Sequence, residues 1–170
     1  MKLSRILHAL TDLALAFCFG GPIVAALAAT SIFRVSTQQG FERAHAVVLA
    51  GEMFARVGPP LLIAACVVGV GTIYGALRPP LNELPSKLRI SLWRAMAVLG
   101  VLVALAVGYM EGLSSRRMHQ LRREGKWEAG KMVNADEQAE FDALHRTATA
   151  IYSFTIIASG ALLLSRRTFS

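Results

Sequence analysis

Four long apolar segments without charge restrict what this chain can fold into. They cover residues 13–33, 57–77, 95–110 and 147–165. A stretch of about 20 apolar residues is long enough to cross the roughly 30 Å hydrocarbon core of a bilayer as a helix. In a chain of 170 residues that is 54% hydrophobic, four such segments indicate a membrane protein rather than a soluble domain with one core.

We predict an all-α fold in which residues 1–170 form a single transmembrane domain, a four-helix bundle. With flanking residues included, the predicted spans are 10–33, 57–77, 92–112 and 145–165. Over residues 41–56, apolar and charged residues alternate with a helical period, which predicts an amphipathic helix in the membrane interface before the second span. Residues 113–142 are predicted to form a polar, mostly helical segment between the third and fourth spans.

Proline, tryptophan and asparagine give local expectations. Pro59 and Pro60 are expected in the first turn of the second span, where proline is tolerated. The prolines within residues 79–85 should end that helix and separate it from the third span. Trp93 is typical of an anchor at the membrane interface. Asn134, three residues before a glutamate, predicts an N-cap for the last helix.

The net charge of +7 bears on partners and on orientation. Lys and Arg flank membrane spans and face anionic lipid, so we expect the lipid bilayer, other membrane proteins or a second copy as partners, and no nucleic acid. Four spans place both termini on one side, with eight Lys and Arg residues there and ten on the other side. The shorter segments are on the termini side, which favours a bacterial inner membrane with both termini cytoplasmic.

The basic N-terminus followed by an apolar run also resembles a cleavable signal peptide, with residues 26–28 (Ala-Leu-Ala) as the cleavage motif. Asp12 interrupts the early apolar region, and the uncharged run is longer than the usual 7–15 residues or so. A retained first span is therefore favoured.

Small residues predict two faces for close helix contact. Gly21, Ala25 and Ala29 recur at every fourth position in the first span, and Gly71 and Gly75 form a GxxxG pair in the second. Side chains this small let helix backbones approach each other. The cysteines, Cys18 and Cys66, lie inside apolar runs, which favours small buried side chains over a disulfide framework.

Polar side chains in the fourth span lie on one side of the helix. At 100° per residue, a single stripe contains His145, Thr149, Tyr152, Thr155 and Ser159. Because a lipid-facing surface would not align its hydroxyls, we expect this stripe to face other helices.

Several ionisable residues have both a functional and a simpler interpretation. His8 and Asp12, four residues apart, could couple to a proton or an ion, but the favoured position is the headgroup level at the start of the first helix. Glu52 and Arg56 favour an ion pair within one helix. The basic residues within 116–123 could bind phospholipid headgroups, although a solvated basic face is more common.

Four spans place His45, His119 and His145 on the same side of the membrane, with Glu52 nearby. These side chains are candidate metal ligands, and His45 with His145 could be axial haem ligands. The favoured alternative is structural and predicts no cofactor: His145 hydrogen-bonds a backbone carbonyl or Glu52. In that case Phe141 and the leucine at position 144 pack beneath the interfacial helix.

The sequence around Phe141, with leucine and histidine three and four residues later, opens a fourth span rich in small residues. Together with a Gly-rich first span ending at Phe33 and an amphipathic approach to the second, this pattern resembles the transmembrane protein 205-like family, whose four-span domain has no known function. The resemblance implies a compact helical bundle in a membrane. Its eukaryotic namesake is linked to platinum-drug tolerance. The family pattern has no fixed histidine matching His45, so the resemblance implies no role for that residue.

The sequence contains no Gly-rich phosphate loop, no HExxH and no serine nucleophile elbow. We therefore expect no enzymatic activity. The favoured function is that of a structural or accessory bundle, a partner of larger membrane machinery. The first alternative is a carrier of a small solute or ion, linked to metal or drug tolerance, and the second is a haem- or metal-binding membrane protein.

Overall fold

The computed structural model describes residues 2–41, 43–78, 86–128 and 131–169. Its elements in chain order are α1 (Lys2–Gln38), α2 (Arg43–Leu77), α3 (Ser86–Tyr109), a π-helical turn η1 (Met110–Ser114), α4 (Ser115–Glu124), β1 (Trp127–Glu128), β2 (Lys131–Met132) and α5 (Ala135–Phe169). The two short strands form an antiparallel hairpin, with Trp127 opposite Met132. The remaining elements are helical, so the protein is an all-α bundle.

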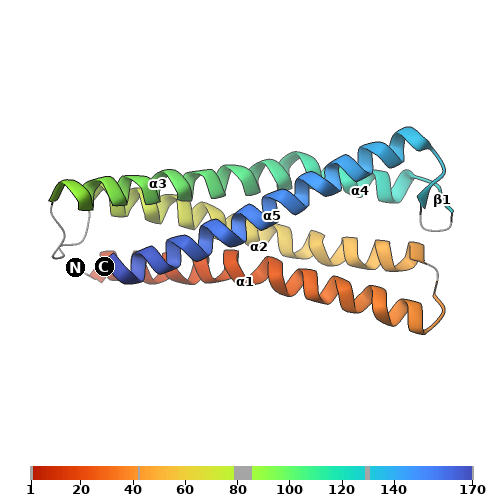
Figure 1. The fold of residues 1–170 in the computed structure, drawn as a ribbon, viewed down its shortest axis with the longest axis horizontal. Coiled ribbons are helices and arrows are strands. Elements are labelled where there is room, and N and C mark those ends of the chain that lie inside the picture. Colours follow the sequence, from red (N-terminus) through yellow and green to blue (C-terminus); the bar gives the residue numbers. More distant parts are fainter. Residues whose placement is uncertain (1, 42, 79–85, 129–130, 170) are drawn as a thin grey trace.

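The four long helices run alternately up and down the bundle (Figure 1). α1 packs along α2, α2 along α3, and α5 contacts both α1 and α3. Both termini lie at one end of the bundle, and the hairpin lies at the other. α5 crosses the bundle at an angle: it begins beside α4 and ends beside α1 (Figure 1).

Four helical stretches are long and apolar enough to cross a membrane: Arg5–Gln38, His45–Leu77, Lys87–Glu124 and Ala135–Thr168. Their outer faces carry large apolar side chains, with Leu13 69%, Ile63 67%, Leu105 64% and Ile157 72% exposed. Such an apolar surface suits contact with lipid rather than water. The predictions of an all-α four-helix bundle and of a multi-pass membrane protein are confirmed.

The main core lies between the four helices. Its fully buried members include Leu15 of α1, Leu61 of α2, Trp93 and Val103 of α3, and Leu162 of α5. A smaller cluster, toward the hairpin end, joins Met110, Met118 and Ala148. The packing between helices is therefore divided into two parts.

The segment predicted as an interfacial helix forms the first part of α2, which continues unbroken from Arg43 to Leu77. Pro59 and Pro60 lie inside this helix, so their predicted position in a first turn is wrong. Each proline removes one amide from the helical hydrogen-bond ladder, the amides that would bond to the carbonyls of Ala55 and Arg56. The helix tolerates this loss because its remaining turns pack against α1 and α3 on either side.

The third helix is longer than predicted and begins at Ser86, so residues 86–91 are helical rather than part of a connection. Trp93 is fully buried in the core, and the prediction of an interfacial anchor is wrong. The expected break at the prolines falls within residues 79–85, outside the part of the chain that the structure describes. Beyond Tyr109 the helix continues through η1 into α4.

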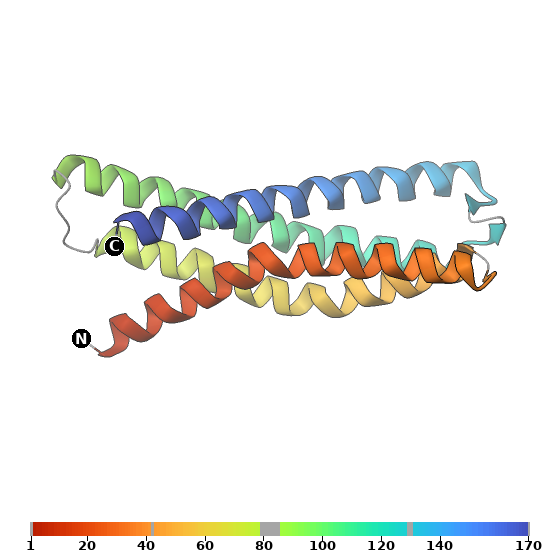
Figure 2. The same ribbon diagram turned by 60° about the horizontal axis from the view of Figure 1, so that its bottom comes forward.

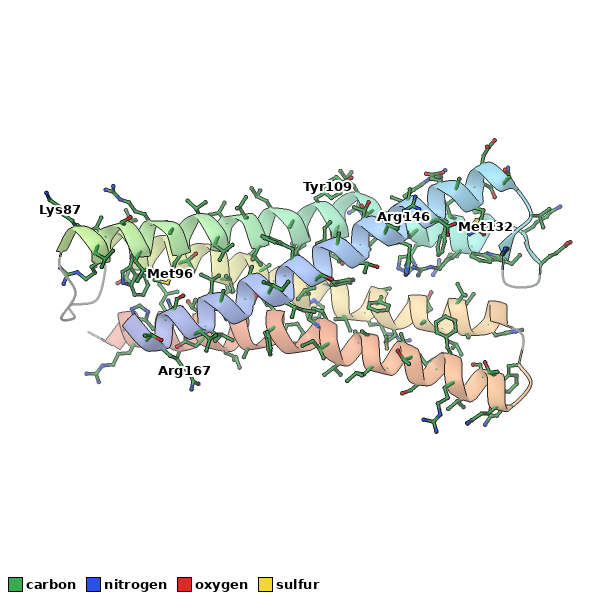
Figure 3. All side chains as sticks on the ribbon, in the orientation of Figure 1. Lys87, Met96, Tyr109, Met132, Arg146 and Arg167 are labelled. Atoms are coloured by element: carbon green, nitrogen blue, oxygen red, sulfur yellow. The ribbon has the colours of Figure 1, made fainter. Side chains whose placement is uncertain are left out.

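The start of α5 is capped as predicted. The Asn134 side-chain oxygen accepts hydrogen bonds from the backbone amides of Asp136 (2.9 Å) and Glu137 (3.5 Å). The hairpin is tied to this helix turn because the amide of Met132 donates to Oε1 of Gln138 at 2.8 Å. Figure 3 shows Met132 at this end, with Lys87 and Arg167 at the opposite end.

α1 contains Pro22 and is bent along its length (Figure 2). Proline lacks the amide that would close a helical hydrogen bond, which accounts for bending in a long helix. The half of α1 beyond Pro22 lies alongside α2. Over the same stretch α5 diverges from α1 toward α4 (Figure 1).

Candidate functional site

The bundle contains an interhelical cavity of about 480 Å³. Its walls come from α1, α2, η1, α4 and α5, in the half of the bundle that ends at the hairpin. Pro22, Ala26, Ala29, Phe54, Met110 and Ile156 contribute apolar surface. A preformed cavity of about 300–1,000 Å³ with apolar walls and a few polar groups is typical of a ligand-binding site.

Polar side chains line the cavity nearest the hairpin: Ser115, His119, Arg122, His145, Thr149 and Tyr152. The first three come from α4 and the last three from α5. Along α5, the lining then becomes apolar toward Ile156, in the middle of the bundle. The cavity thus has a polar, basic end and an apolar interior.

Arg122 holds its guanidinium between two helices. It passes so close to Gly51 of α2 that a Cβ added there would overlap the guanidinium. On the other side, its Cζ lies 5.7 Å from the centroid of the Phe141 ring of α5, a cation–π arrangement. The absence of a side chain at Gly51 is therefore what allows Arg122 to reach the cavity.

The candidate metal ligands do not converge. His119 and His145 both line the cavity, whereas His45 is exposed and does not. Within the described residues, no group of three or more His, Cys, Asp or Glu side chains is placed to hold a metal ion. Glu52 pairs with Arg123 of α4 at 3.7 Å rather than with Arg56 or His145.

His145 itself is exposed, and its ring stacks on that of Phe141 with 6.3 Å between centroids. Phe141 also meets Trp127 edge-on at 5.6 Å and packs with Leu144 against the cluster around Met118. Phe141 and Leu144 therefore pack against α4, a contact that the sequence did not predict. Phe141 also lines the cavity together with Val47 and Gly51 of the first part of α2.

The predicted polar stripe on α5 divides into two parts. Thr155 and Ser159 are fully buried between helices. Tyr152 is half-buried and Thr149 is exposed, and both line the cavity with His145. Thr155 and Ser159 therefore face other helices, while His145, Thr149 and Tyr152 form one wall of the candidate site.

The small residues expected at helix contacts have different environments. Gly71 faces Thr11 of α1, and a Cβ on Gly75 would come within 2.5 Å of the Trp93 ring of α3. Ala25 is buried, and Ala29 lines the cavity. For Gly21, by contrast, the three atoms nearest to an added Cβ belong to Phe17 of its own helix, at 3.6–3.8 Å.

A charged cluster lies at the opposite end of the bundle and consists of His8, Asp12 and Arg166. Nε of Arg166 donates to Oδ1 of Asp12 at 2.7 Å, and Nη2 lies 3.1 Å from Nδ1 of His8. The Arg166 side chain is only 4% exposed, whereas that of Asp12 is 55% exposed. The two residues that the sequence assigned to the headgroup level thus share a partner on α5.

Sequence reasoning missed Arg122 and Arg166 as individual residues. For Arg166 a signal was present, because Tyr152, Ser159 and Arg166 follow one another at intervals of seven. A seven-residue interval keeps side chains on one face of a packed helix, so the polar stripe could have been extended to Arg166. Arg122 has no such signal, since Arg116, Arg117 and Arg123 look equivalent to it in the sequence.

Glu111 lies in η1, where its carboxylate covers Gly58 of α2 and Ser115 Oγ is 3.4 Å from Oε1. This contact between Glu111 and α2 was not predicted from the sequence. Comparison of the chain with models of protein families, with characterised proteins and with solved structures finds no match.

Proposed function

We propose that this protein is an accessory bundle of the membrane that acts by binding, and that its interhelical cavity holds the hydrocarbon part of a lipid. The observation that carries this proposal is the apolar interior of a cavity of about 480 Å³ between lipid-facing helices. The proposal includes membership of the transmembrane protein 205-like family and a bacterial inner membrane location with cytoplasmic termini. It involves no catalysis and no cofactor.

The shape of the cavity suits a chain molecule. Its lining on α1 extends from Pro22 to Phe33, which at 1.5 Å per residue corresponds to roughly 16 Å along the helix axis. Ala26 of α1 and Ser153 of α5 line the cavity and are also exposed. The cavity therefore reaches the outer surface between these two helices, within both predicted spans, where an acyl chain could enter from the bilayer.

The test is to purify the protein in a mild detergent and to count retained lipids by native mass spectrometry. Ala29→Phe fills the cavity, whereas Leu27→Phe adds the same ring to the 65% exposed outer face of α1. We expect wild type and Leu27→Phe to retain lipid and Ala29→Phe to lose most of it. Equal retention by all three proteins would contradict the proposal.

A carrier of a small solute or ion is the second candidate. It is favoured by polar groups inside the bundle, beyond the cavity toward the C-terminal end of α5. Thr155 and Ser159 are fully buried there, and Arg166 follows Ser159 after seven residues, on the same face of the helix. Within the described residues, the Thr155 hydroxyl has no hydrogen-bond partner. Flux of ions across proteoliposomes that is lost in Thr155→Val would support this candidate over a binding protein.

A further inference from the structure

We propose that the interhelical cavity selects an anionic phospholipid of the surrounding bilayer, with its headgroup at Arg122 and one acyl chain between α1 and α5. This inference rests on the proposed lipid-binding function and adds charge selectivity to it. It assigns a particular role to one of the basic side chains on α4.

The charge balance of α4 distinguishes Arg122 from its neighbours. Arg117 forms two hydrogen bonds with the Glu140 carboxylate, at 2.6 and 2.8 Å, and Arg123 pairs with Glu52. Within the described residues Arg122 has no ion pair, and its buried Nε has no hydrogen-bond partner. The nearby Glu52 carboxylate attracts the Arg122 charge but pairs directly with Arg123. A half-buried guanidinium without an ion pair of its own favours an anion, because burying an unpaired charge is costly.

The chemistry of the adjoining surface also fits a headgroup. His119 of α4 and His145 of α5 line the same end of the cavity, as do the hydroxyls of Ser115 and Thr149. The two histidine rings can donate hydrogen bonds to phosphate or glycerol oxygens. The hydroxyls of Thr149 and Ser115 already donate to the His145 carbonyl and to Glu111, and they can accept hydrogen bonds from glycerol hydroxyls. The planar guanidinium of Arg122 can itself donate two parallel hydrogen bonds to one phosphate.

The depth of the site agrees with the dimensions of a lipid. Arg122 lies ten residues beyond the end of the predicted third span at residue 112, or about 15 Å along a helix. That places it outside the hydrocarbon core, on the side of the headgroups, while Ala26, Ser153 and Ile156 lie within the predicted spans. A lipid seated in this way would keep its second acyl chain in the bilayer, beyond the opening between α1 and α5.

Competitive binding to the delipidated protein tests the inference. Phosphatidylglycerol and phosphatidylcholine with identical acyl chains would be offered in equal amounts, and bound lipid measured by native mass spectrometry. We expect wild type to prefer phosphatidylglycerol by about tenfold, the effect of one charge-assisted hydrogen-bonding contact. Arg122→Gln should reduce this preference to near unity, while Arg122→Lys should keep part of it.

Arg123→Gln is the matched control, because Arg123 is adjacent in the sequence but 77% exposed and outside the cavity. It should retain the preference of wild type. The inference is overturned if Arg122→Gln keeps the preference, if Arg123→Gln loses it equally, or if palmitate displaces phosphatidylglycerol at equimolar concentration. If wild type binds both phospholipids without selectivity, the role of Arg122 is refuted but the proposed lipid-binding function is not. If wild type binds neither phospholipid, as expected for Ala29→Phe, the proposed function itself is refuted.

Discussion

Arg166, near the end of α5, donates a hydrogen bond of 2.7 Å from Nε to Oδ1 of Asp12 on α1. Its guanidinium also lies 5.8 Å from the centroid of the Trp93 ring on α3. One side chain therefore joins three helices at the end of the bundle that holds both termini. A buried guanidinium needs such partners, because the charge would otherwise be removed from water without compensation.

Removal of this side chain should destabilise the bundle. We expect Arg166→Gln to lower the free energy of unfolding by about 1–3 kcal/mol, less than for a fully buried pair because Asp12 is 55% exposed. The loss would be measured as a lower Tm in detergent. Arg167→Gln, which changes an exposed arginine at the next position, is the control and should leave Tm unchanged. Equal losses in the two variants would show that the contact with Asp12 is unimportant.

Gly75 is the second point at which the bundle depends on one residue. A leucine there would collide with the Trp93 ring, since a Cβ alone would come within 2.5 Å of it. Overpacking of this kind costs about 1–3 kcal/mol, so Gly75→Leu should lower Tm or prevent folding. Gly20→Leu is a suitable control because a Cβ at Gly20 meets nothing within 4 Å. A Gly75→Leu protein as stable as Gly20→Leu would contradict the observed packing.

The membrane class and the four-helix fold could be predicted because apolarity over a span is a local property of the sequence. The lengths of the helices could not, since helices continue beyond the bilayer: α2 contains the whole segment before Pro59 without a break. The buried position of Trp93 could not be predicted from the sequence either. An aromatic residue near the end of an apolar segment suits the interface or the core, and the space beside Gly75 decides between them.

The candidate site was predictable only in part. The stripe on α5 grouped Tyr152 and His145 on one face of the helix, because one helix determines that spacing, but it predicted contact with other helices rather than a cavity wall. Arg122 required knowledge of which neighbouring arginines find carboxylates on other elements, such as Glu140 for Arg117. The partner of Arg166 lies 154 residues away in the sequence, and no local pattern could identify Asp12 as that partner.

The orientation of the bundle gives a third prediction. Both termini lie at one end of the bundle and the hairpin at the other. Reporter fusions after residue 170 and within residues 125–128 should therefore report opposite sides of the membrane, with the C-terminal fusion cytoplasmic. Two reporters on the same side would contradict the four-span arrangement, and a C-terminus outside the cytoplasm would reverse the proposed orientation.

The N-cap of α5 provides a local test of the hairpin end. Asn134→Ala removes the side-chain oxygen that accepts from the amides of Asp136 and Glu137, and such a loss costs about 0.5–2 kcal/mol. We expect faster amide hydrogen exchange in the first turn of α5, while the amides around Ser159 stay protected. Asn134→Asp, which keeps an acceptor, should restore slow exchange. Unchanged exchange in Asn134→Ala would exclude a stabilising cap.

His145 gives the last prediction, and here the structure changes the expected result. From the sequence alone, His145→Ala should cost about 1–3 kcal/mol through a lost hydrogen bond. The His145 side chain is exposed and, within the described residues, has no side-chain hydrogen bond to lose. We now expect the Tm of His145→Ala to stay close to wild type, like that of an ordinary surface substitution.

Metal analysis of the same preparations separates this expectation from the metal-binding alternative. Wild type, His145→Ala and His119→Ala would be purified together, and bound iron, copper and zinc measured per protein chain. We expect no stoichiometric metal in any of them, because His45 lies outside the cavity that His119 and His145 share. One equivalent of metal in wild type, lost in both variants, would contradict this expectation and assign the cavity to a metal instead of a lipid.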